Sequence, residues 1–178
     1  RVSSVVREVS SAHGPIYGLI NNAGTSSMNH ISLTPGSSSR KVFDVNFHGL
    51  FFMLREVSKR MMRNGGGRIV NMSTVAAPLE LEGEAIYSSS KAAVEQLTKV
   101  ASKELADYGI TVNAVGPTPI KTDLIKGVSE SKIKDLIARQ AIERYAEVSD
   151  VQNVIDFFLK EESNFITGQV IYLGGVTN

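Results

Sequence analysis

Apolar residues near the start of the chain first recur at helical spacing and then form a short run. Valines between residues 2 and 9 follow a helical period, which predicts a helix over residues 1–12 that ends near Gly14-Pro15. The apolar run 16–20 predicts a short strand. Residues 25–37 are rich in Ser, Thr, Asn, Pro and Gly, and this composition predicts a loop.

Residues 38–63 have apolar side chains almost all round the middle of the segment. This pattern predicts a long helix that is covered on more than one side. A glycine run at 65–67 ends it. Either the sheet and neighbouring helices cover this helix, or a second subunit does.

The remaining pattern alternates between the two kinds of element. It predicts strands at 68–72, 110–115 and 169–173, and helices at 84–107 and near 121–126, 130–141 and 149–159. Strands that alternate with helices indicate a parallel sheet covered on both faces, which is an α/β fold. A chain of 178 residues suits one domain, spanning 1–178.

Composition excludes several classes of protein. The net charge of +1 gives no field that would attract nucleic acid or an anionic membrane, so we expect neither as a partner. The absence of cysteine excludes disulfides and a cysteine nucleophile, and fits a cytoplasmic location. The three histidines have no metal-ligand spacing, so we expect no metal. No apolar run is long enough to span a bilayer.

The most informative chemistry is the pair Tyr87 and Lys91. Residues four apart on a helix share one face. An ammonium beside a phenol favours phenolate, so this pairing predicts a lowered Tyr87 pKa and a tyrosine that exchanges protons near neutral pH. In many helices, however, such a tyrosine merely packs and the lysine is solvated.

Polar residues follow three of the predicted strands. They are Asn21 to Gly24, the hydroxyl pair Ser73-Thr74, and Gly116 to Thr122. Ligands bind at the carboxyl ends of parallel strands. We therefore expect these three loops to converge on one cleft together with Tyr87.

Taken together, these motifs resemble the short-chain dehydrogenase/reductase family over essentially the whole chain. The matching positions are Asn21-Asn22-Ala23-Gly24, Asn46, Tyr87 with Lys91, Pro117 to Thr122, and Thr167 through Gly175. The resemblance implies a Rossmann-like doubly wound sheet and an NAD- or NADP-dependent oxidoreductase that interconverts a carbonyl and a secondary alcohol by hydride transfer. It also implies a homo-oligomer, dimer or tetramer.

The resemblance also implies roles for single residues. Tyr87 would act as the acid/base, Lys91 would assist it and contact the nicotinamide ribose, and Asn46 would hold a relay water. A hydroxyl at Thr74, thirteen residues before Tyr87, would donate to the developing oxyanion, with Ser73 as the alternative. The cofactor-binding positions would be Asn21, Ala23, Gly24, Tyr87, Lys91, Pro117, Ile120 and Thr122.

The chain departs from the family pattern in three places. Thr74 replaces the usual serine, and Thr118 replaces a glycine, which predicts a stiffer loop before Pro119. No glycine-rich phosphate loop follows a strand and opens a helix. The chain also opens at Arg1 inside a helical pattern, so we expect the fold to be truncated at its N-terminal side. A non-catalytic fragment, or an interaction module with a relic active site, is therefore the alternative function.

Overall fold

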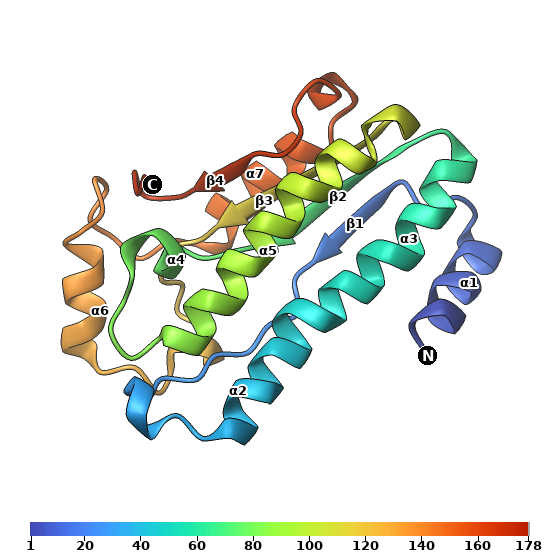
Figure 1. The fold of residues 1–178 in the computed structure, drawn as a ribbon. Coiled ribbons are helices and arrows are strands. Elements are labelled where there is room, and N and C mark those ends of the chain that lie inside the picture. The colour runs from blue at the N-terminus through green and yellow to red at the C-terminus, as the bar shows by residue number, and fades with distance from the viewer. Residues whose placement is uncertain (178) are drawn as a thin grey trace.

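The computed structural model describes residues 1–177, in which four parallel strands form one sheet (Figure 1). The strands are β1 (Gly18–Asn21), β2 (Gly67–Met72), β3 (Ile110–Gly116) and β4 (Val170–Tyr172). Their spatial order is β1-β2-β3-β4, with Ile69 of β2 opposite Val112 of β3. The predicted parallel α/β sheet is confirmed, with strand ends displaced by one or two residues from the predicted positions.

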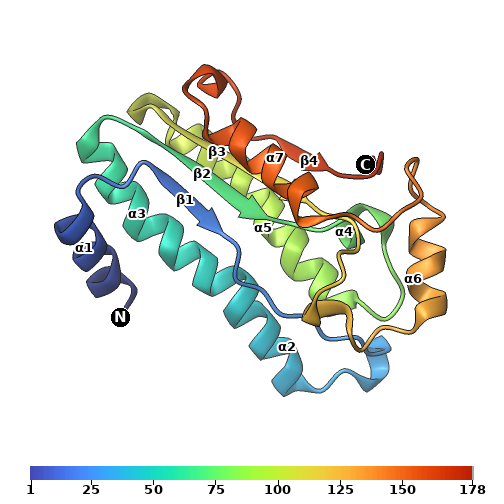
Figure 2. The same ribbon diagram turned by 180° about the vertical axis from the view of Figure 1, so that it is seen from behind.

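Helices cover both faces of this sheet. The helices α3 (Leu50–Asn64) and α5 (Ala85–Glu104) lie on one face, and α7 (Val148–Leu159) lies on the other (Figures 1 and 2). Neighbouring residues of a strand point to opposite faces. Ile69 accordingly joins the core beneath α3 and α5, whereas Val70 joins the core beneath α7.

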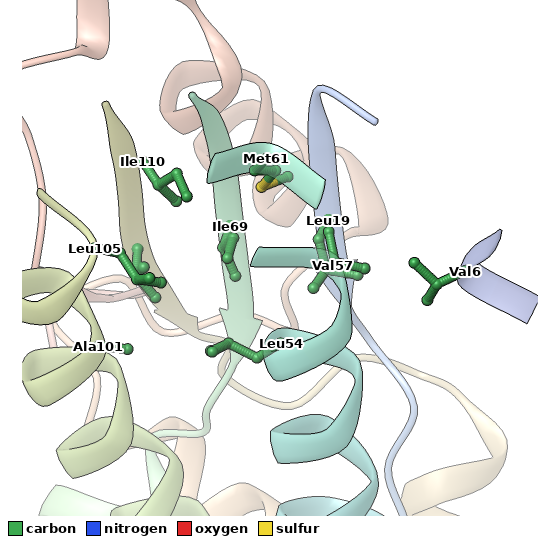
Figure 3. Close-up of a cluster of buried hydrophobic side chains, with 10 residues drawn as sticks. Val6, Leu19, Leu54, Val57, Met61, Ile69, Ala101, Leu105 and Ile110 are labelled. Atoms are coloured by element: carbon green, nitrogen blue, oxygen red, sulfur yellow. The ribbon is translucent and has the colours of Figure 1, made fainter. Parts of the chain in front are cut away.

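The larger core joins three helices to three strands. Leu54, Val57 and Met61 of α3 pack over Ile69 and Leu19 (Figure 3). The helix α1 (Val2–His13) adds Val6 from the edge beside β1. These apolar contacts hold the carboxyl ends of β1, β2 and β3 at one edge of the molecule, where the polar loops begin.

The predicted helix 38–63 is interrupted. The helix α2 (Gly36–Phe43) leads into a π-helical segment, η2 (Asp44–Gly49), which continues into α3. The predicted long helix is therefore present over residues 36–64, but its π-helical turn at 44–49 was not predicted. Apolar periodicity does not report this change, because the wider turn retains the helical direction while shifting which side chains face inward.

Short elements complete the chain. They are η1 (Ile31–Leu33), α4 (Ala76–Leu79), η3 (Ala106–Tyr108), η4 (Asp123–Ile125), α6 (Glu130–Ile137) and η5 (Glu161–Ser163). Predicted helices at 121–126 and 130–141 are therefore present in shorter form. Within residues 1–177, no helix has both the length and the apolar character required to cross a membrane.

Candidate active site

A cavity of about 360 Å³ opens at the carboxyl ends of β1, β2 and β3. This volume lies within the range of small-molecule sites. Of the predicted site residues, it is lined by Gly24, Thr74, Tyr87, Lys91, Pro117, Ile120 and Thr122. The structure thus brings the three predicted loops together around Tyr87, while Asn21, Ala23 and Asn46 lie outside the lining.

Tyr87 and Lys91 enter this cavity from the first turns of α5. Both side chains are buried, with 8% of Tyr87 and 4% of Lys91 exposed. The Lys91 ammonium donates a hydrogen bond to the carbonyl oxygen of Met72 at 2.7 Å. A methyl group placed on Gly24 would lie 3.6 Å from the Lys91 Nζ, so this glycine leaves open the space in front of the ammonium.

The predicted lowering of the Tyr87 pKa is wrong for this structure. Burial raises the pKa of Tyr87 to about 12, a hydrogen bond with the Thr74 side chain opposes that rise, and the charge of Glu84 adds to it. The Lys91 ammonium is directed at Met72, and burial lowers its own pKa to about 8. Loss of hydration outweighs the helical pairing because both groups lie inside the protein.

The two hydroxyl residues after β2, Ser73 and Thr74, have different partners. Ser73 also lines the cavity, but its hydroxyl donates a hydrogen bond to the carboxylate of Glu95. The Thr74 side chain instead interacts with Tyr87, and its Oγ1 accepts a hydrogen bond from the backbone N–H of Ala76 at 3.2 Å. This arrangement favours Thr74 over Ser73 for contact with a ligand oxygen.

Asn46 lies in η2 and is completely buried. Its Oδ1 accepts from the Thr25 N–H at 2.8 Å, and its Nδ2 donates to the Thr25 carbonyl at 2.9 Å and to the Ser90 hydroxyl at 3.0 Å. The side chain thus fastens the loop after β1 to α5. Both N–H groups of Asn46 are engaged by these two contacts. Asn46 therefore supports Thr25, which lines the cavity, without lining the cavity itself.

The other predicted positions on the β1 loop have different surroundings. Asn21 is buried, and its Nδ2 donates to Oδ1 of Asn71 at 2.8 Å, which ties β1 to β2. Ala23 is exposed, and Gly24 borders the cavity. The geometry therefore gives Asn21 a structural contact in the sheet and leaves Gly24 as the loop residue that faces a ligand.

The loop after β3 forms the opposite wall. Pro117, Ile120 and Thr122 line the cavity. Thr118 also borders it but is buried, and its methyl group packs so closely on Gly174 that an added Cβ there would lie 2.9 Å away. The threonine that replaces the family's glycine is therefore accommodated by the C-terminal segment.

Several lining residues carried no recognisable signal in the sequence. They are Thr25, Ser26, Met28, Met72, Val75 and Val128. Most belong to irregular loops whose path is set by the elements packed around them. Only their position next to the predicted loops could have indicated them.

Glu84 brings a negative charge to the cavity wall three residues before Tyr87. Burial raises the pKa of its carboxyl, and the positive charge of Lys132 on α6 opposes this. The wall is otherwise largely apolar near Leu124 and Ile125. A ligand that enters here therefore meets apolar surface, a single carboxylate and the Tyr87 phenol.

Comparison with known proteins places this site in context. A family model described as enoyl-(acyl carrier protein) reductase matches residues 1–177. The 3-oxoacyl-[acyl-carrier-protein] reductase of Staphylococcus epidermidis is 33% identical over 174 residues, which are 98% of this chain and 71% of that protein.

Solved structures agree with this sequence match. A short-chain type dehydrogenase/reductase from Mycobacterium ulcerans has a TM-score of 0.91 at 30% identity, covering 97% of this chain and 64% of that one. A gluconate 5-dehydrogenase from Burkholderia cenocepacia, in complex with NADP and tartrate, has a TM-score of 0.93 at 27% identity, covering 98% and 69%. An NAD+-bound xylitol dehydrogenase has a TM-score of 0.89 at 29% identity, covering 98% of this chain and 74% of that one.

Proposed function

The chain belongs to the short-chain dehydrogenase/reductase family, and from this premise we propose that it carries the catalytic part of an NAD- or NADP-dependent oxidoreductase. The proposed reaction interconverts a small carbonyl compound and a secondary alcohol. The observation that carries the proposal is the convergence of Thr74, Tyr87 and Lys91 on one cavity.

Tyr87 is the proton donor in this proposal. With its pKa raised to about 12 by burial, the phenol is protonated at neutral pH, and it can donate to a carbonyl oxygen because the alkoxide that develops there is a stronger base than the phenolate. Thr74 would donate a second hydrogen bond to the same oxygen. Lys91, whose pKa is lowered to about 8, still carries its charge at neutral pH and stabilises the phenolate that remains.

The residues of the cleft fit the nicotinamide end of a dinucleotide. The space in front of Gly24 borders the Lys91 ammonium, which could bind a ribose hydroxyl, and Ile120 and Thr122 form the wall opposite. When bound, the nicotinamide supplies or accepts the hydride. The pyrophosphate end has no counterpart in this sequence, since no glycine-rich turn opens a helix after a strand.

Replacement of Tyr87 by Phe tests the proposed reaction. The ring stays and the proton is removed, so the rate of NAD(P)H-dependent carbonyl reduction should fall by about 10²-fold or more. Tyr108→Phe, at a half-exposed tyrosine beyond α5, is the matched control and should retain full turnover. Equal turnover in the wild type and Tyr87→Phe would remove Tyr87 from the mechanism.

The alternative is a non-catalytic member of the family that retains a relic cleft. The observation in its favour is that residues 1–178 contain no glycine-rich turn that follows a strand and opens a helix. Absence of carbonyl reduction by the wild-type chain at saturating NADH and NADPH would support it. We also propose that the protein is cytoplasmic, whichever function it has. Imaging of the tagged protein would test this location.

A further inference from the structure

A buried carboxylate lies behind the catalytic loop and has no part in the proton transfer described above. Glu95 follows Lys91 by one turn of α5 and is only 8% exposed. Transfer of an ionised carboxylate out of water is costly unless it gains hydrogen bonds or an opposite charge. Among residues 1–177 no lysine or arginine forms an ion pair with Glu95.

Two hydroxyl groups face this carboxylate. Ser73 donates a short hydrogen bond to its Oε1. The Tyr172 phenol of β4 is buried without a partner at ideal geometry, and its pKa is raised first by burial and then by its interaction with Glu95. The Tyr172 ring reaches this place over Gly116, where any larger side chain would collide with it.

The Ser73 contact holds the backbone segment that carries Thr74. Backbone N–H groups of Ser73 and Val75 donate to the carbonyls of Val115 and Pro117, so β2 pairing with β3 continues through this segment. Asn71 bonds to Thr98 and Ser73 to Glu95, so two side chains fasten the end of β2 to α5. Thr74 follows directly and lines the cavity with Tyr87, which lies on the same helix.

We propose that Glu95 is a positioning residue, which holds Ser73 from behind so that the Thr74 hydroxyl faces Tyr87. Glu95 itself contacts no ligand, because it does not line the cavity. Tyr172 supports the carboxylate from β4. In this arrangement α5 carries both Tyr87 and the group that aligns the second hydroxyl with it, so one rigid helix sets their relative geometry.

Only the expected change in kcat rests on the proposed reaction. The expected change in the Thr74 rotamer does not. Ser73→Ala removes the donor, and Glu95→Ala removes the acceptor. In both variants the Thr74 side chain should turn away from Tyr87, which crystal structures or NMR measurement of the Thr74 χ1 rotamer would show. Misalignment on this scale should lower kcat by about 10- to 10²-fold while KM changes much less.

Two further variants separate alignment from packing. Glu95→Gln keeps an oxygen that accepts from Ser73, so it should restore the Thr74 rotamer and most of kcat. Ser102→Ala removes a buried hydroxyl on the same helix that bonds only to the Lys99 carbonyl, and should change neither. If Glu95→Ala does not fold, Ser73→Ala decides the question.

The outcomes are distinct. An unchanged Thr74 rotamer in Ser73→Ala overturns the positioning role, as does an equal loss of kcat in Ser102→Ala. A rotamer change in a chain whose wild type shows no turnover supports the positioning role while contradicting the proposed reaction.

Discussion

At the scale of single residues, Tyr87 and Lys91 show opposite pKa shifts with one cause. Burial disfavours the charged form of each, so the phenol pKa rises and the ammonium pKa falls. The hydrogen bond from Lys91 to the Met72 carbonyl holds the ammonium in the cleft. Burial of the charged group lowers the stability of the folded state. The cavity therefore contains a buried ammonium that destabilises the folded protein and that a ligand can contact.

This cost should be visible in the pH dependence of folding. The ordinary lysine pKa of 10.5 applies to the unfolded chain, and the folded value is about 8. Between these pH values the unfolded state binds the extra proton, so the unfolding free energy should rise as pH increases from 8 to 10.5. Below pH 8 Lys91 is charged in both states, and the full free-energy cost of burying its ammonium is present.

Lys91→Met should remove this pH dependence. Relative to the variant, the wild type should gain up to about 3 kcal/mol between neutral pH and pH 10.5, measured by urea unfolding. Loss of the hydrogen bond to Met72 shifts all values for the variant by about 1 kcal/mol without changing the slope. Lys99→Met, at an exposed lysine on the same helix, is the control. Identical slopes for wild type and Lys91→Met would contradict the buried charge.

At the scale of elements, the helices that support the cleft also leave apolar side chains in water. Phe51 and Phe52 of α3 are 36% and 40% exposed, and Val100 of α5 is 41% exposed. The two helices lie side by side on one face of the sheet (Figure 1). Apolar side chains that stay exposed on neighbouring helices can form an interaction surface.

We therefore predict that the chain self-associates through α3 and α5. Light scattering at micromolar concentration should give a dimer or tetramer for the wild type. A Phe51→Asp, Phe52→Asp double variant should shift the mass toward the monomer, because the interface would have to bury two carboxylates. Val148→Asp, at an exposed valine that begins α7, should not. A monomeric wild type would contradict the prediction.

At the scale of the whole molecule, the cleft at the end of the sheet corresponds to one half of the dinucleotide site that we propose. The strand β1 is at one end of the strand order, and Ile20 on it is 45% exposed. In the proposed site Lys91, Ile120 and Thr122, which line the cavity, would contact a nicotinamide, whereas phosphate recognition normally uses a glycine-rich turn and a helix N-terminus.

Dinucleotide binding by this chain should accordingly be weak. Calorimetry should give NADH and NADPH dissociation constants of about 1 mM or weaker, which corresponds to about −4 kcal/mol. Reduced nicotinamide mononucleotide should bind about as well as either, because the adenosine half gains no contacts. Micromolar binding of NADH or NADPH that clearly exceeds that of the mononucleotide would contradict this.

The sequence by itself determined the order of elements and the general position of the site. Helical periods located the main helices and short apolar runs located all four strands, because the buried positions of each element must be apolar. The Tyr87–Lys91 spacing and the polar residues after three strands located the cavity, since parallel strands end at the same edge. Assignment to the family followed from those same residues.

Tertiary structure alone decided what those residues do to one another. The π-helical turn at Asn46, the division of Ser73 and Thr74 between Glu95 and Tyr87, and the direction of the Tyr87 pKa all depend on contacts between distant segments. Spacing along a helix specifies which side chains are neighbours, but it does not specify how much water surrounds them. Hydration and long-range hydrogen bonds set the energies of charged groups, and these exist only after the chain has folded.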